Sequence, residues 1–389
     1  MTMHEEVDYT FRQLSAMFVG ESSGSMKPVT VLTINGGGMR GLYATYVLHT
    51  LAECFATRRE VNGLDIGKGF DLVVGTSTGA ILTAGIAAGI PLERIMALYK
   101  EAGPQIFKDP VPPYDKSLKL SRRISFYHWL WRHRRRAGNS NEKLESALRD
   151  TFGELTFGEL YERRGIGVCV PATSYLHHTP RIFKTPHIPD KQRDNDVLLA
   201  DACLASSAAP IYLPLASIKA DGLEDQIYAD GGLWANNPVL IGLLEALAVS
   251  APRQPVVILS VGTCPPPSGT LPPENLDQGV AEWRSGIRVM ELAMNVQVYA
   301  ACNAVLRLVD QLNRLKKRVH ILRCEESIPS SKQAELLQLD SASQDALDLM
   351  KRLGNKDGHD TFRWCQKPVG EDGKLLDDIF DRMPAYEVL

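Results

Sequence analysis

Short apolar runs alternate with longer stretches of helical periodicity over the first two thirds of the chain. Runs of β-branched and aliphatic residues predict strands at 29–34, 70–74, 166–170 and 256–261. Apolar residues at helical spacing predict helices over 42–55, 80–88, 91–101, 197–207 and 237–249. Strands that alternate with helices are typical of a mostly parallel sheet covered by helices on both faces. The pattern therefore predicts an α/β fold with three layers.

The pattern changes after the last of these strands. Prolines crowd residues 264–273, as in a hinge between two parts of a chain. Beyond this segment the spacing predicts one or two long helices over 279–313, a strand at 318–323 and a further helix over 341–353. We therefore expect an N-terminal segment (1–27), a core (28–264) and a mainly helical C-terminal part (265–389) that packs on the core.

The composition is that of an ordinary globular protein. The chain has 389 residues, of which 44% are hydrophobic and 23% are charged, and its net charge is −3. Such a charge provides no field that would attract nucleic acid, so we expect no DNA partner. No run approaches the ~18 apolar residues that a membrane-spanning helix requires, and the acidic N-terminus does not read as a signal peptide. We therefore predict a cytoplasmic protein that meets a membrane only at its surface.

The cysteines and acidic residues do not form the spacings of a metal site. The seven cysteines are scattered and never spaced as Cys-x-x-Cys, which is typical of a reducing compartment and argues against a disulfide framework or a zinc site. The sequence also has no loop with the oxygen ligands of an EF-hand. We therefore expect neither a metal nor another cofactor in the chemistry.

Ser77 lies at the centre of a Gly-x-Ser-x-Gly motif, between a predicted strand and a predicted helix. Flanking glycines at 75 and 79 allow the sharp turn that exposes a nucleophilic hydroxyl. The helix that follows directs backbone N–H groups and the positive end of its dipole toward this turn. The context is therefore that of a catalytic serine.

Two further glycine motifs supply what a serine nucleophile needs. A glycine-rich loop at 36–41 follows the first predicted strand, and Asp230 follows another apolar run and precedes two glycines. A serine hydroxyl requires an adjacent base and hydrogen-bond donors for the oxyanion that forms on attack. The sequence thus contains a nucleophile, a set of oxyanion donors and a carboxylate base.

At these residues the chain resembles the patatin-like phospholipases, which are lipid acyl hydrolases with a Ser–Asp dyad. The resemblance rests on the loop at 36–41, the turn around Ser77, the stretch 205–210, and Asp230-Gly231-Gly232 with Asn236-Asn237-Pro238, all in the family's order. It covers about 28–264 and fades after Thr263. Residue 35 is Asn, where many relatives have Asp or Ser.

The resemblance implies a three-layer patatin-like fold and roles for particular residues. Ser77 corresponds to the nucleophile and Asp230 to its base. The oxyanion hole corresponds to the loop residues Gly36, Gly37, Gly38, Met39 and Arg40, chiefly through the N–H groups of Gly37, Gly38 and Met39. The supporting motif residues are Gly41, Gly75, Gly79, Gly231 and Gly232. This set implies a phospholipase that cleaves acyl esters of glycerophospholipids.

Three other interpretations stay open at this point. The loop at 36–41 also has the form of a dinucleotide-binding fingerprint, although Glu60 is a poor match for its acidic residue. A Ser-His-Asp triad is compatible with the chain order if His320 or His359 is the base. The third interpretation is a catalytically silent nucleotide-binding or scaffold module with the same fold, in which Ser77 has no role. Taken alone, Asp230 before two glycines is also typical of a turn.

A basic and aromatic segment at 116–136 has no place in the catalytic motifs. Such charge runs are usually solvated faces, but arginine interleaved with tryptophan also suits phospholipid headgroups or a nucleotide. The candidate contact residues are Arg122, Arg123, Trp129, Trp131, Arg134, Arg135 and Arg136.

The resemblance extends most closely to bacterial cytosolic members, some of which are membrane-degrading effectors that cyclic oligonucleotides activate in antiphage defence. It implies a phospholipid substrate at the inner face of the membrane and a cyclic dinucleotide activator. An active phospholipase in the cytosol would attack its own cell, so we expect a site that is closed at rest. Whether the protein forms a homo-oligomer is left open by the sequence.

Overall fold

The computed structural model describes residues 26–112, 120–219, 226–264, 276–280, 282–366 and 370–386, without the side chains of 120–123. Its centre is an eight-stranded sheet with the order β5-β6-β3-β2-β1-β7-β8, in which β4 pairs with β3. The strands are β1 (Val29–Ile34), β2 (Leu72–Gly75), β3 (Gly167–Ser174), β4 (Thr179–Lys184), β5 (Ala216–Ile218), β6 (Gln226–Asp230), β7 (Val256–Val261) and β8 (Val319–Arg323).

The sheet is parallel from β3 to β8 and antiparallel at its other end. Strand β1 pairs in parallel with β2 and β7, β2 with β3, and β7 with β8, whereas β4, β5 and β6 pair antiparallel. Ile34 at the end of β1 is level with Gly75 on one side and Val261 on the other. The carboxyl ends of three neighbouring strands therefore lie side by side, which is where open α/β sheets place their ligand sites.

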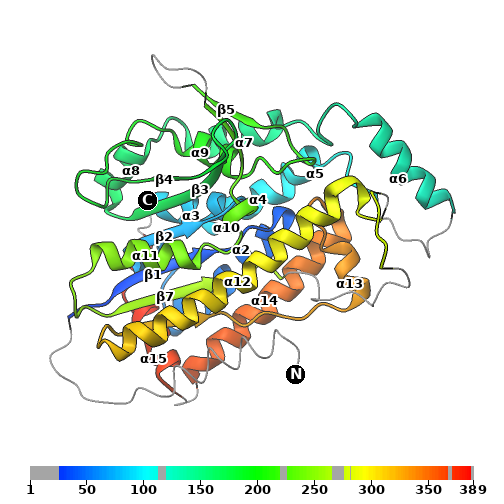
Figure 1. Ribbon diagram of the computed structural model, residues 1–389. Coiled ribbons are helices and arrows are strands. Elements are labelled where there is room, and N and C mark those ends of the chain that lie inside the picture. The colour runs from blue at the N-terminus through cyan, green and yellow to red at the C-terminus, as the bar shows by residue number, and fades with distance from the viewer. Residues whose placement is uncertain are drawn as a thin grey trace.

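Helices cover both faces of the sheet, as the alternation of strands and helices predicts (Figure 1). One layer is built from α2 (Gly41–Arg58), α3 (Thr78–Ala88), α4 (Leu92–Glu101), α9 (Leu199–Ser206) and α14 (Gln344–Gln366). The other layer is built from α11 (Val239–Val249) and α12 (Ile287–Arg314).

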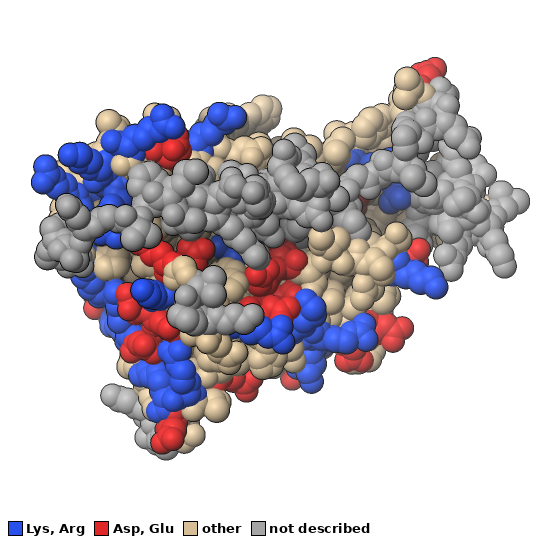
Figure 2. Space-filling view, turned by 90° about the horizontal axis from the view of Figure 1, so that it is seen from below, with Lys and Arg blue, Asp and Glu red and all other residues tan. Residues whose placement is uncertain are grey.

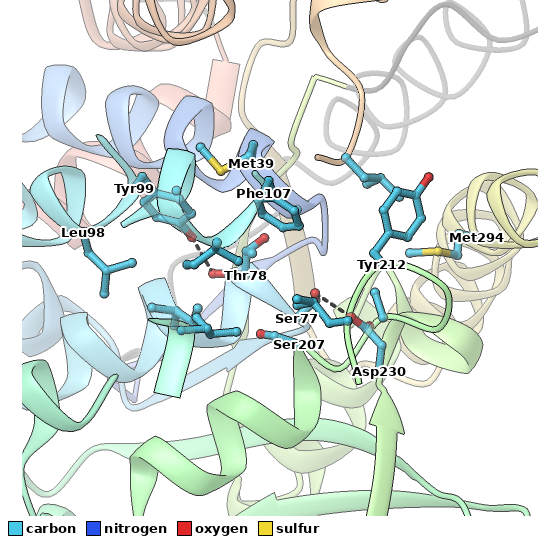
Figure 3. A pocket seen from close by; sticks show the side chains of 18 residues that line it. Met39, Ser77, Thr78, Leu98, Tyr99, Phe107, Ser207, Tyr212, Asp230 and Met294 are labelled. Atoms are coloured by element: carbon cyan, nitrogen blue, oxygen red, sulfur yellow. Dashed lines mark hydrogen bonds between the residues drawn. The ribbon is translucent and has the colours of Figure 1, made fainter. Parts of the chain in front are cut away.

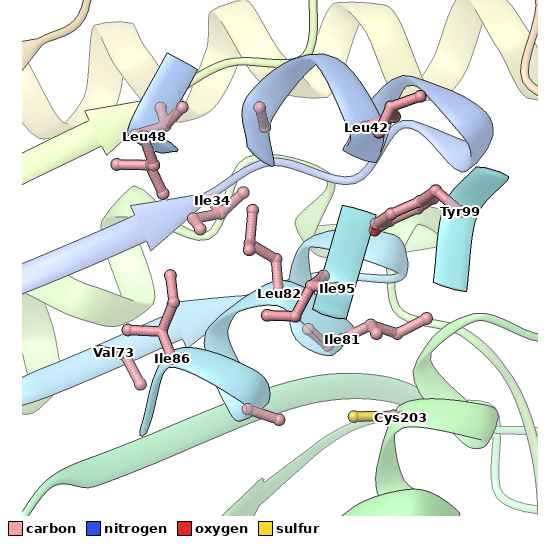
Figure 4. Packing of buried hydrophobic residues seen from close by; sticks show 14 of the residues in the cluster. Ile34, Leu42, Leu48, Val73, Ile81, Leu82, Ile86, Ile95, Tyr99 and Cys203 are labelled. Carbon is pink, nitrogen blue, oxygen red and sulfur yellow. The ribbon is translucent and has the colours of Figure 1, made fainter. Parts of the chain in front are cut away.

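Successive residues of β1 point into the two different layers. Leu32 and Ile34 belong to the larger hydrophobic cluster, and Val29 and Val31 to the smaller one under α11 and α12. Figure 4 shows Ile34 in the larger cluster together with Leu42 of α2 and Leu82 of α3. A strand buried on both faces must be apolar throughout, which explains the unbroken run at 29–34.

The C-terminal part contributes to the same core. Strand β8 extends the sheet beside β7, and α14 packs along α2. The Tyr43 hydroxyl donates to Asp357 Oδ2 at 2.6 Å, which joins the two helices inside the core. The proline-rich hinge predicted at 264–273 falls almost wholly outside the described residues, and so does the N-terminal segment.

Several elements were not predicted from the sequence. Most of them are short. An exception is the helix at 142–152, whose buried Leu144, Leu148 and Phe152 have a helical spacing that was overlooked. The unpredicted elements comprise β4, β5, α5 (Gly103–Ile106), α6 (Leu120–Arg132), α7 (Glu142–Phe152), α8 (Phe157–Arg164), α10 (Gly232–Ala235), α13 (Ser331–Leu336), α15 (Gly370–Asp381) and the 3₁₀ turns η1 (Gly38–Arg40), η2 (Ile66–Gly69) and η3 (Arg284–Gly286).

One described helix corrects the expectation from hydropathy. The segment Arg284–Arg314 is long and apolar enough to cross a membrane by length and composition, with a mean hydropathy of 1.3 in its 18-residue window, of which 28% is buried. Asn and Gln interrupt its apolar residues, so no continuous run is visible in the sequence. In the fold, its buried residues Cys302, Val305, Leu306 and Val309 pack on the smaller cluster.

The charged residues do not form one large patch on the face seen in Figure 2. Basic and acidic side chains are interspersed over the coloured part of that face. This distribution agrees with the net charge of −3. Attraction of an anion must therefore come from local clusters of arginine or lysine.

Candidate active site

Ser77 occupies a strained turn between β2 and α3. Its backbone has φ 54° and ψ −127°, a conformation that a residue with a side chain rarely adopts. The glycines around it are required by close approach, because a Cβ at Gly75 would collide with the Gly79 carbonyl and one at Gly79 would lie 2.6 Å from the Ile34 carbonyl oxygen. Such strain at a single residue is typical of functional sites.

Ser77 and Asp230 are in direct contact in the buried floor of a pocket (Figure 3). Ser77 Oγ donates a hydrogen bond to Asp230 Oδ2 at 2.8 Å. The other carboxylate oxygen accepts from the Gly232 N–H at 2.6 Å. Burial raises the pKa of Asp230 to about 7, against the opposing effects of the Gly232 N–H and the Ser77 hydroxyl. The carboxylate is therefore poised to exchange a proton with the hydroxyl near neutral pH.

The sheet brings these residues together although they are far apart in the sequence. Strand β3 extends beyond the end of β2, and β6 pairs with this extension so that Asp230 is level with Ala172. The last residue of β6 consequently faces the turn at the end of β2. Ser77 and Asp230 therefore follow two strands, β2 and β6, that both pair with β3.

The stretch 205–210 connects the turn to the carboxylate. The Ser206 hydroxyl accepts from the Ser77 N–H at 2.8 Å and donates to the Pro171 carbonyl at 2.5 Å. The Asp230 N–H donates to the Ala208 carbonyl at 2.9 Å. These bonds hold both members of the Ser–Asp pair on one rigid segment, which gives the stretch a physical role that the resemblance alone did not provide.

The glycine-rich loop lies beside Ser77, and its N–H groups have different partners. The Gly36 N–H donates to the Asn236 carbonyl at 2.9 Å, the Met39 N–H to the Leu339 carbonyl at 2.8 Å, and the Arg40 N–H to the Gly37 carbonyl at 3.1 Å. Within the described part of the chain, the N–H groups of Gly37 and Gly38 have no hydrogen-bond partner. The expectation that Met39 also supplies a free donor is wrong for this conformation, because a distant carbonyl already occupies its N–H.

Two side chains hold the carbonyls of this loop from behind. Thr263 Oγ1 donates to the Gly36 carbonyl at 3.0 Å, and Arg40 Nε donates to the Gly37 carbonyl at 3.2 Å. The C=O and N–H of a trans peptide point in opposite directions. These bonds therefore turn the N–H groups of Gly37 and Gly38 away from Thr263 and Arg40.

The sequence did not point to Thr263. It placed Arg40 in the oxyanion loop but predicted no particular bond for its side chain. Thr263 follows β7, and the available signal was that parallel strands 29–34 and 256–261 should end at the same edge of the sheet. Arg40 is buried, and burial lowers the pKa of its guanidinium. It contacts the loop and does not line the pocket.

The pocket above Ser77 is largely apolar, with an empty volume of about 630 Å³ that includes its mouth. Its walls include Ile81, Leu98, Phe107, Leu213, Met294 and Leu339. The hydroxyls of Thr78 and Ser207 also face this site, and neither has a hydrogen-bond partner among the described residues. An apolar chain with one polar end fits such a pocket.

No histidine lines this pocket among the described residues. His320 lies on β8 with its Nε2 3.5 Å from Glu371 Oε1, and burial lowers its pKa. His359 lies on α14 with its Nδ1 3.3 Å from Cys54 Sγ. The Ser-His-Asp triad considered from the sequence is therefore wrong for this structure.

The basic and aromatic segment is only partly a surface. Trp129 is 3% exposed and donates its Nε1–H to the Asp109 carbonyl at 3.2 Å, so its assignment as a membrane or nucleotide contact is wrong. Trp131 is 63% exposed, and the Arg134 guanidinium lies 4.8 Å from its ring centre. Arg135 and Arg136 are exposed as well. The side chains of Arg122 and Arg123 lie outside the described residues.

A buried group of metal-ligand residue types is explained without an ion. Cys169, His187 and Glu245 bring one potential ligand atom each within 4.8 Å of the others. Glu245 already accepts from Lys184 Nζ at 2.9 Å and contacts His187 Nε2 at 3.1 Å, and burial raises the pKa of the Cys169 thiol well above its usual value. A paired carboxylate and a protonated thiol are poor metal ligands.

Comparisons with known proteins agree with this site. The family model described as patatin-like phospholipase matches residues 32–243. A cGAMP-activated phospholipase of Pseudomonas aeruginosa is 32% identical over 327 residues, which cover 84% of this chain and 86% of that protein. A cGAMP-activated phospholipase of Escherichia coli is 30% identical over 87% of this chain and 91% of its own. A cUMP-AMP-activated phospholipase of Escherichia coli is 29% identical over 60% of this chain and 63% of its own. The chain therefore belongs to the patatin-like phospholipase family.

Proposed function

We propose that the protein hydrolyses acyl esters of membrane glycerophospholipids through an acyl-enzyme on Ser77. The observation that carries this proposal is the 2.8 Å hydrogen bond from Ser77 Oγ to Asp230 Oδ2 at the floor of an apolar pocket. A hydroxyl next to a carboxylate with a pKa of about 7 is an activated nucleophile. The apolar walls suit a fatty acyl chain better than a polar substrate.

Acylation follows from this arrangement. Ser77 Oγ attacks the ester carbonyl carbon while its proton passes to Asp230, and the carbonyl oxygen becomes an oxyanion. The N–H groups of Gly37 and Gly38 donate to this oxyanion, which is the charge that such sites must stabilise. When the tetrahedral intermediate collapses, the C–O bond to the glycerol breaks. The departing alkoxide takes the proton from Asp230 and leaves as a lysophospholipid.

Deacylation repeats these steps with water. Asp230 removes a proton from a water molecule, whose oxygen attacks the acyl carbon on Ser77. Collapse of the second tetrahedral intermediate breaks the bond to Ser77 Oγ, which recovers its proton from Asp230. The products are a free fatty acid and the starting enzyme. The unpaired hydroxyls of Thr78 and Ser207 are available to position the water or the ester.

We further propose that a cyclic oligonucleotide activates the enzyme and that it acts at the inner membrane from the cytoplasm. The support is that relatives covering most of this chain are named cGAMP-activated phospholipases, and another is named for cUMP-AMP. Such a ligand activates only if it binds the active conformer more tightly than the resting one. Activation of this kind would suit an effector that must stay silent until infection.

The structure contains a contact suited to a resting state. The Leu339 carbonyl accepts from the Met39 N–H at 2.8 Å, and Leu339 also lines the pocket. Next to it, buried Asp340 accepts from the Val111 N–H at 2.6 Å. The segment 337–340 is thereby fixed over the oxyanion loop and against the segment that follows Phe107. Release of this segment would open the pocket beside Gly38.

Lipid mass spectrometry of vesicles treated with the protein or with its Ser77→Ala variant tests the hydrolase. Each protein is assayed alone, with cGAMP and with cyclic UMP-AMP. We expect lysophospholipid and free fatty acid only from the parent, and much more of both with one of the nucleotides. Full hydrolysis without added nucleotide would contradict the proposed activation by a cyclic nucleotide. Nucleotide binding without Ser77-dependent hydrolysis would favour the silent nucleotide-binding module.

A further inference from the structure

Helix α12 borders the catalytic pocket through Met294. On the inner side, Met294 lines the pocket, and Glu291 accepts from the Tyr212 hydroxyl at 3.1 Å. Further along, Cys302 and Val305 are buried in the smaller hydrophobic cluster. The residues on the inner side of α12 therefore contact either the pocket or the core.

The outer side of α12 is exposed over more than four turns, and Asn303 is the one polar residue among its exposed positions from 289 to 304. Val289 is 49% exposed, Leu292 is 51% exposed and Val296 is 56% exposed. Spacings of three and four residues place them on one face of the helix, and the exposed Ala293, Ala300 and Ala304 continue the same stripe. The sequence between Glu291 and Arg307 contains no charged residue. We call this face the α12 stripe.

In a core helix such a stripe would be buried, and on a solvated helix this face would carry charged residues. The α12 stripe is neither buried nor charged. Exposed apolar patches of this kind mark sites of interaction with a protein or a membrane. What covers the stripe therefore has to be decided from its surroundings.

A second exposed apolar row lies on α6. Ile124, Tyr127 and Trp131 are exposed and are again spaced three and four residues apart. The exposed arginines 132 and 134–136 follow at the end of the helix. Arg132 pairs with Asp109 Oδ2 at 3.3 Å, which leaves the cluster 134–136 as the candidate for headgroups. Apolar side chains next to arginine suit the boundary between acyl chains and anionic headgroups.

Tyr212 connects both helices to the mouth of the pocket. The segment after α6 is held by bonds from the Gly138 N–H to the Ile211 carbonyl at 2.7 Å and from the Asn139 N–H to the Tyr212 carbonyl at 3.0 Å. The Tyr212 hydroxyl in turn binds Glu291 of α12. Tyr212 itself lines the pocket. The two apolar rows are thus tied to the same wall of the site.

We propose that the α12 stripe is the surface by which the enzyme enters the acyl region of a phospholipid bilayer, with α6 as the adjoining contact for headgroups. The proposal rests on the proposed function, since a phospholipase must take its acyl chain from a bilayer. With the stripe in the interface, the pocket lies behind the helix at a distance of about one helix diameter, ~10 Å. A lipid pulled out of the bilayer would then have a short apolar path past Tyr212 and Met294.

The test compares a triple variant, V289S/L292S/V296S, with the parent and with a matched control, Y175S/L176S. Tyr175 and Leu176 are exposed to a similar degree but lie on the turn between β3 and β4. Each protein is mixed with phosphatidylcholine–phosphatidylglycerol vesicles at 0.1 M and 1 M salt, with and without cGAMP, and co-sedimentation is measured. Hydrolysis of a soluble short-chain ester reports whether the catalytic site is intact.

We expect the triple variant to bind vesicles at least about tenfold more weakly at both salt concentrations, because apolar burial is not screened by salt. The control should bind like the parent. A second variant, R134S/R135S/R136S, should lose binding mainly at 0.1 M salt. The soluble ester should be hydrolysed at the parental rate by all of them.

Vesicle binding by the triple variant that equals the parent's at both salt concentrations would overturn the proposal. So would a parent oligomer in lipid-free solution that dissociates in the triple variant while vesicle binding persists, since the stripe would then bind a second copy of the chain. A parent that binds vesicles through the stripe but cleaves neither ester nor lipid would refute the proposed function instead.

Discussion

The floor of the pocket and the segments outside it are held in different ways. We call these outer segments, α6, α12 and residues 337–340, the rim. At the floor, Ser77, Asp230 and the glycine loop are held by a network of buried hydrogen bonds from four strand ends. At the rim, α6 and α12 expose Ile124, Trp131, Leu292 and other apolar side chains to solvent. The floor is organised before substrate arrives, whereas we propose that the exposed apolar side chains of the rim are covered when the protein binds a bilayer.

The floor carries out the chemical step, and the rim concerns how a lipid enters the pocket. Preorganised donors and a positioned base lower the barrier of the chemical step without reorganisation. In our proposals, the apolar rim and the Leu339 contact over the oxyanion loop decide when and where a lipid reaches that step. Substitutions at the floor should therefore act on turnover of every ester, and substitutions at the rim only on membrane substrate or on the resting state.

The sharpest test of the floor is removal of its two reacting groups. Ser77→Ala and Asp230→Ala should each lower the hydrolysis of a soluble ester by about 10³-fold or more, because the nucleophile or its base is lost. His320→Ala and His359→Ala are matched controls and should keep most activity, since both lie away from the pocket. Steady-state ester hydrolysis by folded proteins decides this, and a His320→Ala enzyme as inactive as Ser77→Ala would refute the dyad.

A smaller effect is expected from the residue that orients the oxyanion loop. Thr263→Val keeps the shape of the side chain but removes the donor to the Gly36 carbonyl. We expect kcat to fall by about 10- to 100-fold with little change in KM, since a lost oxyanion donor costs up to about 10³ and Thr263 acts only through the loop. Thr263→Ser should restore most of kcat. Equal losses in both variants would indicate a packing role instead.

A rim substitution should raise activity. Asp340→Ala removes the acceptor for the Val111 N–H and frees the segment that carries Leu339. A hydrogen bond to a charged group contributes about 1.5–3 kcal/mol, so we expect about a tenfold gain in activity without nucleotide. The rate measured with saturating cGAMP should change much less. Unchanged basal activity in a folded variant would show that this segment is no gate.

The last expected effect is on stability and not on a rate. Burial raises the pKa of Asp230 to about 7, above the ~3.9 of an unfolded chain, so the folded state holds a proton that the unfolded state releases. Stability from this group is present below about pH 4 and is lost as pH rises toward 7. Asp230→Asn cannot ionise, so its advantage over the parent should grow by at most about 1.4 kcal/mol per pH unit in this window and then level off.

Urea unfolding of the parent and Asp230→Asn between pH 5 and 8 measures that difference. The same carboxylate makes activity rise with pH through about 7, because only the ionised form accepts the Ser77 proton. Stability and activity should thus change in opposite directions over the same interval. A stability difference that stays constant with pH would contradict the raised pKa of Asp230.

Local patterns in the sequence were enough to predict strands β1, β2, β3, β7 and β8, the turn at Ser77 and its partner Asp230. A strand buried on both faces must be a run of apolar residues, and a turn crowded by carbonyls must have glycine at 75 and 79. Such requirements act on neighbouring residues, so they can be seen without the fold. The α/β class follows from the same short-range rules.

Only the tertiary structure decided which N–H groups remain free, where Thr263 acts and which tryptophan is exposed. The Met39 N–H is occupied by the carbonyl of Leu339, 300 residues later, and Thr263 reaches Gly36 because two parallel strands end level. Trp129 is buried and Trp131 exposed because one helix packs on Asp109 with one side only. Each outcome depends on contacts between segments far apart in the chain, and the residue types themselves carry no record of those contacts.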